Sequence, residues 1–234
     1  MYDKLQQIGI NIDEKQKILF SSFSDLFIEY NSKVNLISKN DINFLFQKHI
    51  YDSLAFNLFY KKYIGKKFIK VMDIGTGGGF PAIPISLLYE NIEVTALDSI
   101  NKKINFIKTA ADKLNIKNIN PICSRAEDLP VSMKNSFDVI VSRAMADLRI
   151  ILEYAIPYLK TGGFFVAYKS QKAEEEICNA KNALLKLNSV VIDRIEYSLP
   201  IDEENKRVLL VIKKEKDISS IYPRKNGQVK KTPL

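Results

Sequence analysis

The glycine-rich segment VMDIGTGGGFP, residues 71–81, constrains the possible folds of this chain more than any other feature. Glycines at the end of a strand let the backbone turn sharply and approach a ligand without an intervening Cβ atom. Such a turn is typical of parallel α/β sheets, in which ligands bind beyond the carboxyl ends of the strands. We therefore expect an α/β fold with a small-molecule site at the end of the apolar strand 68–74.

Strands and helices alternate along the chain after this turn. Apolar runs predict strands at 68–74, 92–97, 119–123, 137–141, 163–168, 190–198 and 207–213, and helical spacing predicts helices at 82–89, 102–114, 148–159 and 173–187. This alternation predicts a parallel sheet with helices on both faces. The connection 199–206 is too short for a helical crossover, so we expect the last two strands of a seven-stranded mixed sheet to form an antiparallel hairpin.

The charge balance indicates the class of partner. Lys and Arg number 35 against 27 Asp and Glu, which gives a formal net charge of +8, and such an excess favours anionic partners such as nucleic acid. The abundant lysine is also what the codon bias of an AT-rich genome would produce. No apolar run is long enough to cross a bilayer, and residues 1–16 are too polar for a secretion signal.

Two cysteines, Cys123 and Cys178, form neither a CxxC pair nor a disulfide framework. This cysteine usage favours a reducing, cytoplasmic setting, and we expect no metal site. Both cysteines are expected to be packing residues rather than nucleophiles, because neither lies in a motif that would activate a thiol.

Regions with other patterns flank the alternating part. Residues 1–62 read as an N-terminal helical subdomain, with Asp41 as the expected N-cap of its second helix. Residues 63–214 form the predicted sheet domain, and residues 215–234 a basic tail. The stretch 222–231 holds four cations and no anion, which is compatible with a solvated end or with an arm that contacts RNA.

Two aspartates bracket the glycine turn. Asp73 begins an acid-x-Gly-x-Gly-x-Gly pattern that continues through Gly75, Gly77 and Gly79, and Asp98 ends the second strand. A carboxylate in the position of Asp98 can accept the hydroxyls of a bound ribose. An acid in the position of Asp73 favours a cationic ligand. The pair therefore indicates S-adenosylmethionine, a nucleoside that carries a positive sulfonium.

A dinucleotide site is the competing interpretation of the same turn. Gly77, Gly79 and Ala82 nominally satisfy the GxGxxA pattern of such sites. Pro81 and Pro84, however, interrupt the region in which a phosphate-binding helix must offer its backbone N–H groups. The prolines, together with the late position of the pattern, argue against a nicotinamide-dependent oxidoreductase.

Several separate segments of the chain resemble one family, the bacterial small-subunit ribosomal RNA guanine methyltransferases, also called glucose-inhibited division protein B. The similar segments are DIGTGGGFPAIPIS, LDSINKKINFI, SRAEDLP, VSRAMADL, the lead-in EYNSKVNLISKND…HIYDSLA and the ending YPRKNGQVKKTPL. The resemblance implies a class I S-adenosylmethionine-dependent methyltransferase with a Rossmann-like fold, which transfers a methyl group to N7 of one guanine in 16S ribosomal RNA. It also implies the small ribosomal subunit as partner, and we expect a cytoplasmic monomer.

The resemblance also implies roles for residues at matching motif positions. Gly75 and Phe80 would line the donor site, Ala126 and Glu127 would flank the adenine, and Arg143 would contact the cofactor or the substrate. We expect no catalytic residue in the strict sense, because guanine N7 has a free lone pair and needs no general base. Rate would come from alignment and from exclusion of water.

Other residues complete the set of candidates. The single histidine, His49, is expected to pack in the helical subdomain rather than to contact substrate. The candidates for RNA contact are Arg125, Lys169, Arg224 and Lys225. Two further functions stay open on the residues alone: a methyltransferase that acts on a small molecule or a protein, and a non-catalytic factor that binds RNA.

Overall fold

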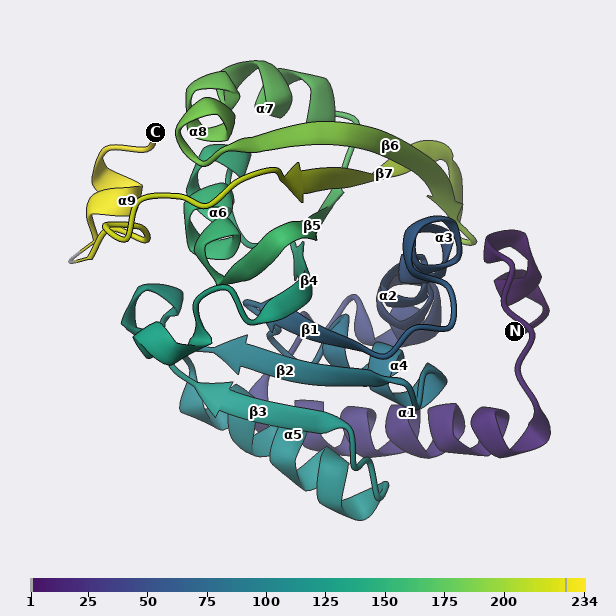
Figure 1. Cartoon of the computed structure of the whole chain (residues 1–234). Coiled ribbons are helices and arrows are strands. Elements are labelled where there is room, and N and C mark those ends of the chain that lie inside the picture. Colours follow the sequence, from purple (N-terminus) through teal and green to yellow (C-terminus); the bar gives the residue numbers. More distant parts are fainter. Residues whose placement is uncertain (1, 226) are drawn as a thin grey trace.

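A seven-stranded sheet with helices on both faces organises the computed structural model, which describes residues 2–225 and 227–234 (Figure 1). Its strand order is β3-β2-β1-β4-β5-β7-β6. The strands are β1 Ile69–Ile74, β2 Ile92–Asp98, β3 Ile119–Cys123, β4 Phe137–Arg143, β5 Leu159–Lys169, β6 Ser189–Leu199 and β7 Asp202–Lys214. The α/β fold expected from the alternating pattern is confirmed.

The pairing of the strands explains where a ligand can bind. Strands β1 to β5 are parallel, whereas β7 runs antiparallel to both β5 and β6, so the expected terminal hairpin is also confirmed. The chain proceeds from β1 outward to β3 and then returns to the other side of β1 as β4. This reversal leaves a crevice beyond the carboxyl ends of β1 and β4, where α/β sheets bind ligands.

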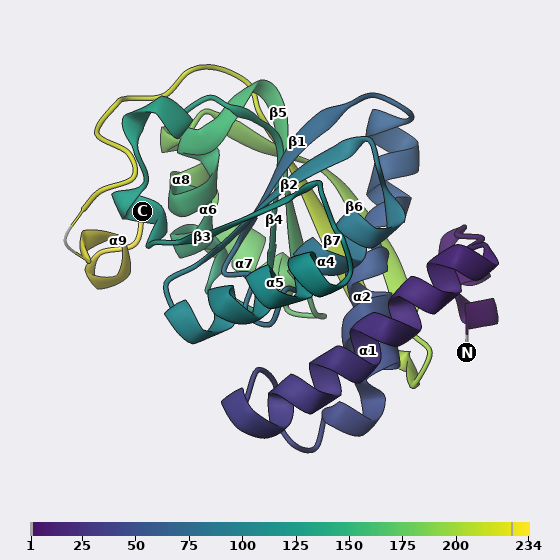
Figure 2. The same cartoon turned by 90° about the horizontal axis from the view of Figure 1, so that it is seen from below.

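Hydrophobic residues on the two faces of the sheet build two cores. Neighbouring residues of one strand point to opposite faces, so Val71 and Val139 belong to one core, and Met72 and Ile140 to the other. The first core lies under α1, α4 and α5, and the second under α6 and α8, as Figures 1 and 2 show from two directions. The α-helices with these labels are α1 Glu14–Val34, α4 Ala82–Leu88, α5 Asn101–Lys113, α6 Leu148–Ala155, α7 Ala173–Asn179 and α8 Lys181–Lys186.

The N-terminal helical region is less regular than its apolar spacing predicts. Helix α1 starts with a capping box, in which Asp13 accepts the N–H of Gln16 and the Gln16 side chain accepts the N–H of Asp13. Asp41 occupies the N-cap position of the next helix, as expected, but it makes no side-chain cap hydrogen bond, because its carboxylate accepts from the Ser38 hydroxyl and the Lys48 ammonium. The following segment alternates short helices of different type, with bounds Ile42–Phe44, Leu45–Ile50, α2 Tyr51–Leu54, α3 Phe56–Phe59 and Tyr60–Ile64.

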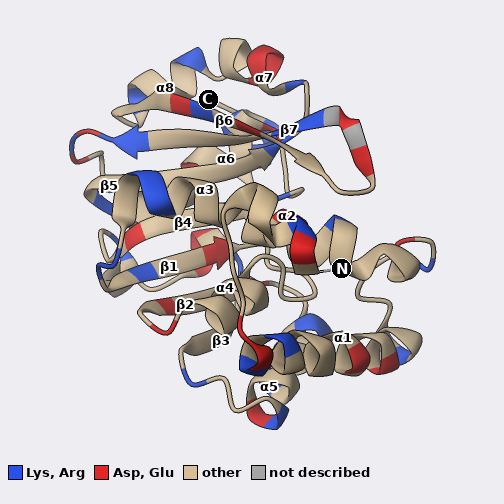
Figure 3. Ribbon diagram, turned by 90° about the vertical axis from the view of Figure 1, so that its right-hand side faces the viewer, with Lys and Arg blue, Asp and Glu red and all other residues tan. Residues whose placement is uncertain are grey.

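The same segment packs directly on the sheet. Phe59 of α3 contacts Phe164 of β5 edge to face, with ring centroids 5.6 Å apart, and one continuous hydrophobic cluster joins Phe23 and Phe59 to Val71. Figure 3 shows basic and acidic residues interspersed along α1, where Glu29 and Lys33 form an ion pair. The positive excess of the chain is therefore not concentrated on this helix.

The basic C-terminal segment is folded against α6, and it includes a short helix, α9 Gln228–Lys231 (Figure 1). Tyr222 and Val229 are buried in the second core. Arg224 pairs with Glu153 of α6, a side chain with no exposed area, and the Lys134 ammonium donates to the carbonyl of Tyr222. These contacts favour a packed tail over the solvated end that the composition left open. Across residues 2–225 and 227–234, no helix is long and apolar enough to cross a membrane.

Candidate active site

The glycine turn after β1 has a backbone that requires glycine. Gly75, Gly77 and Gly79 have φ angles of 76°, 58° and 89°, a left-handed region that other residues rarely adopt. The backbone N–H groups of Gly75 and Thr76 both donate to the carbonyl of Leu97 on β2. The turn is thereby attached to the end of the neighbouring strand, which brings it close to Asp98.

Asp98 links the turn to the helix that follows β2. One of its carboxylate oxygens accepts the N–H of Gly77 at 2.9 Å, and the other accepts the N–H of Ile100 at 2.9 Å. The Lys103 ammonium lies 4.0 Å away. A carboxylate has about four acceptor positions, so Asp98 keeps capacity for ribose hydroxyls while the two backbone bonds hold it in place.

Asp73 lies beneath the turn and not on a cavity wall. It has no exposed area, and one of its oxygens accepts the N–H of Ala82 at 3.1 Å. Burial raises the pKa of Asp73 to about 7, against the opposing effect of hydrogen bonds to its ionised form. Its influence on a cationic ligand would therefore act through its charge, across the loop, rather than through the direct contact suggested by its place in the motif.

A cavity of about 350 Å³ opens beside this turn. Four of the expected donor-site residues line it: Gly75, Asp98, Ala126 and Glu127. Residues that the sequence did not single out also line it, among them Tyr154 on α6, Met145 after β4 and Lys230 in the tail. The volume lies in the range of small-ligand sites, and the lining combines a carboxylate for hydroxyls with apolar surface for a base.

A second cavity, of about 820 Å³, adjoins the first. Arg143, at the end of β4, lies on its wall, and Nη1 of its guanidinium donates to Asp52 at 2.9 Å and to the carbonyl of Lys48 at 3.1 Å. Its Nη2 lies 2.9 Å from Nδ1 of His49. The guanidinium carbon also lies 5.4 Å from the ring centroid of Phe80, so Arg143 connects the glycine turn to the N-terminal helices.

His49 and Asp52 are the site residues that the sequence analysis missed. His49 was expected to pack among helices, yet its ring lies against Phe80, with centroids 5.2 Å apart, and lines the larger cavity. Asp52 is buried, and it accepts both from Arg143 and from the hydroxyl of Tyr197 at 2.5 Å. The spacing of His and Asp in HIYD, which places both on one side of a helix, was the available signal.

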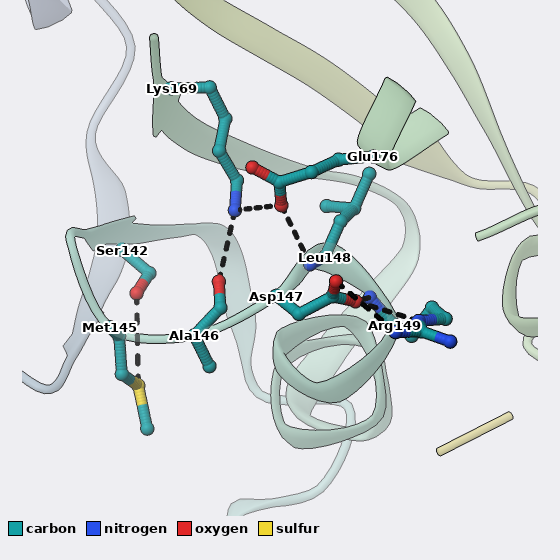
Figure 4. A network of polar contacts seen from close by, with 8 residues as sticks. All are labelled: Ser142, Met145, Ala146, Asp147, Leu148, Arg149, Lys169 and Glu176. Atoms are coloured by element: carbon teal, nitrogen blue, oxygen red, sulfur yellow. Dashed lines mark hydrogen bonds and ion pairs between the residues drawn. The ribbon is translucent and has the colours of Figure 1, made fainter. Parts of the chain in front are cut away.

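The loop after β4 separates the two cavities, since Ala144 and Met145 line both. Figure 4 shows how this loop is held. The Lys169 ammonium donates to the carbonyl of Ala146 at 3.0 Å and to Glu176 at 2.6 Å, and Glu176 accepts the N–H of Leu148 at 2.9 Å. Lys169, expected to contact RNA, is thus only 11% exposed and bound within the chain.

The other candidates for RNA contact also include both residues bound within the chain and residues exposed to solvent. Arg224 is bound to Glu153, whereas Arg125 and Lys225 are exposed, and Arg125 lines the smaller cavity. Cys123 and Cys178 are both exposed, so the expectation that they pack inside was wrong. Residues 2–225 and 227–234 contain no group of three or more His, Cys, Asp or Glu side chains placed to hold a metal ion.

Sequence relatives span the full length of this chain. Residues 16–207 match the family model of GidB, rRNA small subunit methyltransferase G. Ribosomal RNA small subunit methyltransferase G of Streptococcus pyogenes serotype M12 (strain MGAS2096) is 38% identical over 235 residues, which cover 100% of this chain and 98% of that protein. The protein of the same name from Streptococcus gordonii (strain Challis) is 39% identical with the same coverage.

Solved structures share the fold at lower identity. A SAM dependent methyltransferase from Aquifex aeolicus aligns with a TM-score of 0.56 and 20% identity over 77% of this chain and 97% of that one. M. jannaschii TYW2 in complex with AdoMet aligns with a TM-score of 0.53 and 18% identity over 65% and 72%. These likenesses support the class I methyltransferase architecture. The family model and the full-length relatives together establish that this chain belongs to the rRNA small subunit methyltransferase G (GidB) family.

Proposed function

We propose that this protein transfers a methyl group from S-adenosylmethionine to N7 of a guanine in 16S ribosomal RNA. The observation that carries the proposal is a pair of adjoining cavities in a member of this family. The smaller cavity has the glycine turn and Asp98 on its wall, and the larger one meets it at Ala144 and Met145. A donor in the first and a base in the second would face each other across that loop.

The proposed donor fits the residues of the smaller cavity. Asp98 would accept the ribose hydroxyls, and Ala126 and Glu127, which form a single helical turn after β3, would flank the adenine. Gly75 allows close approach of the backbone, and Asp73 would supply a negative charge beneath the sulfonium. The donor, when bound, supplies an electrophilic methyl group.

The residues of the chain would accelerate the reaction by placement. Guanine N7 has a free lone pair, so no side chain has to remove a proton before the attack. Phe80 is almost completely buried, and its ring packs against the His49 ring and the Arg143 guanidinium. Met145, on the wall of both cavities, would exclude water from the line of transfer. Alignment and desolvation of this kind can lower a barrier substantially.

The proposed RNA surface includes Arg125 on the wall of the smaller cavity and Lys225 in the tail. Arg125 and Lys225 are the exposed candidates, and the net charge of +8 favours the approach of an RNA polyanion. We further propose that the protein acts in the cytoplasm as a monomer. Its proposed organisation is a helical region 1–62, a donor-binding region 63–214 and a tail 215–234.

The test is transfer of labelled methyl from S-adenosylmethionine to small ribosomal subunits, followed by chemical cleavage at 7-methylguanosine. One site in 16S RNA is expected, and Arg143→Ala should abolish the signal, whereas Arg194→Ala, at an exposed arginine paired with Glu174, should not. Many sites, or a different methylated base, would refute the assignment. Label in small molecules or proteins instead of RNA would favour the alternative methyltransferase, and no label at all would favour the non-catalytic RNA-binding factor.

A further inference from the structure

The two ring nitrogens of His49 have different surroundings. Nδ1 lies 2.9 Å from Nη2 of Arg143, whereas Nε2 is buried with no hydrogen-bond partner in the part of the chain that the structure describes. A guanidinium has donors only, so Nδ1 must be the acceptor of this contact. A neutral imidazole then carries its proton on Nε2. His49 therefore presents a buried N–H donor without an acceptor, a kind of group that native proteins seldom leave unmatched.

The charges around the ring keep it neutral. Burial lowers the pKa of His49 to about 4, and the positive charge of Arg143 adds to this effect, as Lys48 does more weakly. Asp41 and Asp52 act in the opposite direction but do not outweigh burial. A second proton would also place an N–H group against the guanidinium. The tautomer with its proton on Nε2 is thus the stable form at neutral pH.

The two carboxylates whose charges act on the ring are bonded to other groups. The oxygens of Asp52 accept from Tyr197 and Arg143, and those of Asp41 accept from Ser38 and Lys48. None of these bonds involves Nε2–H, so a bound ligand that offers an acceptor would satisfy this buried donor. The position of the ring fits a ligand contact, because His49 lies against Phe80 at the glycine turn and on the wall of the larger cavity.

We propose that the Nε2–H of His49 donates a hydrogen bond to O6 of the acceptor guanine and thereby selects guanine at the methyl-transfer site. This inference rests on the proposed function and names the residue that reads the base. Guanine presents two acceptors, N7 and O6, side by side on one edge, whereas adenine places an amine donor beside its N7. A neutral imidazole N–H cannot accept, so the contact suits O6 and repels the adenine amine.

Two substitutions separate the roles of the ring nitrogens. His49→Asn keeps an oxygen that can accept from Arg143 at the position of Nδ1, but its side chain is too short to reach the position of Nε2. His49→Gln is long enough to place an amide donor near that position. We expect His49→Asn to lower kcat/KM for methylation of small subunits by roughly 10- to 100-fold, the range of one good base contact. His49→Gln should recover most of the loss.

The same hydrogen bond can be removed from the side of the substrate. RNA with 2-aminopurine in place of the target guanine keeps N7 but lacks O6. The wild-type protein should lose about as much activity on this RNA as His49→Asn loses on guanine. His49→Asn itself should barely distinguish the two substrates, because the contact is already absent. Affinity for S-adenosylhomocysteine, measured by calorimetry without RNA, should change less than about twofold in both variants, since the discrimination belongs to the base contact.

Because His49 is the single histidine of the chain, nitrogen-15 labelling of histidine gives one imidazole spectrum on the unmodified protein. The expected spectrum at pH 7 has the proton on Nε2, and the Nε2–H signal should move when substrate RNA is added but not with S-adenosylhomocysteine alone. This measurement does not depend on the folding of any variant.

Four results would overturn the proposal. They are equal activity of His49→Asn and wild type, loss of donor affinity in parallel with activity, failure of His49→Gln to recover activity, and a proton on Nδ1. A loss of donor affinity would assign Nε2–H to the carboxylate of the donor instead. If the wild-type protein methylates no ribosomal RNA, the proposed function itself fails, and this outcome is recognised before any His49 variant is tested.

Discussion

Removal of the Arg224 side chain tests whether the basic tail is part of the folded core. Glu153 has no exposed area, and its oxygens accept three hydrogen bonds from Arg224: from the backbone N–H at 2.9 Å, from Nε at 2.8 Å and from Nη2 at 2.6 Å. Arg224→Ala keeps the backbone bond but removes the two others and the counter-ion. A buried carboxylate is then left without a cation.

The expected loss of stability follows from that burial. Removal of one partner of a buried ion pair costs about 3–5 kcal/mol, and the lower end applies here because the Arg224 side chain is 21% exposed. In a chain of this size, a loss of 1 kcal/mol lowers the melting temperature by about 2–4 °C. Arg224→Ala should therefore lower the melting temperature by roughly 6–12 °C.

Thermal unfolding followed by circular dichroism measures this effect, with Lys225→Ala as the matched control. Lys225 is the adjacent cation but is exposed, and its removal should change stability by less than about 0.5 kcal/mol. The double variant Glu153→Leu/Arg224→Leu should be more stable than Arg224→Ala, because it leaves no unpaired buried charge. Equal melting temperatures for Arg224→Ala and Lys225→Ala, with RNA affinity lost in the former, would refute this reasoning and assign Arg224 to the RNA.

Three further outcomes are expected. Asp98→Ala should weaken binding of the donor by roughly 10- to 100-fold in calorimetry, since a charged acceptor for the ribose is lost; unchanged affinity would exclude Asp98 from the site. The pKa of Asp73 is about 7 in the free protein, and a cationic donor favours its ionised form. Donor binding should therefore release a proton, and affinity should rise with pH up to about 7 and then level off, while Asp73→Asn should show a flatter profile. Gly79→Ala should lower the free energy of unfolding by roughly 2–4 kcal/mol, because its Cβ would lie 2.5 Å from Ile83 at a φ of 89°. Urea unfolding measures this loss, with Gly162→Ala as the control, because Gly162 has a φ of 84° and no atom within 4 Å of an added Cβ. Gly162→Ala should lose only the free energy that the unfavourable φ costs, and equal losses for the two variants would contradict the predicted clash.

Much of the fold could be predicted from local patterns. Strand β1, the glycine turn and Asp98 at the end of β2 follow from alternation, glycine chemistry and chain order, because a parallel sheet brings the carboxyl ends of its strands to one edge. The short connection before β7 likewise required a hairpin. Element boundaries shifted by a few residues, and the irregular turns of segment 42–64 had no signal in the apolar spacing, because that segment follows the surface of the sheet on which it packs.

The amino-acid sequence by itself determined the sheet, its switch point and the residues beside the glycine turn, since alternation, glycine spacing and chain order can be read within short stretches of the chain. Only the tertiary structure decided which charged groups find partners inside the molecule. Arg143 meets His49 across 94 positions of sequence, and Arg224 meets Glu153 across 71. Lys169 likewise turns inward to Glu176 and not outward to RNA. Lys and Arg residues that look alike in the sequence thus have different partners in the structure. The partner of a charge depends on distance and burial in three dimensions, which the periodicity of apolar residues along the chain does not encode.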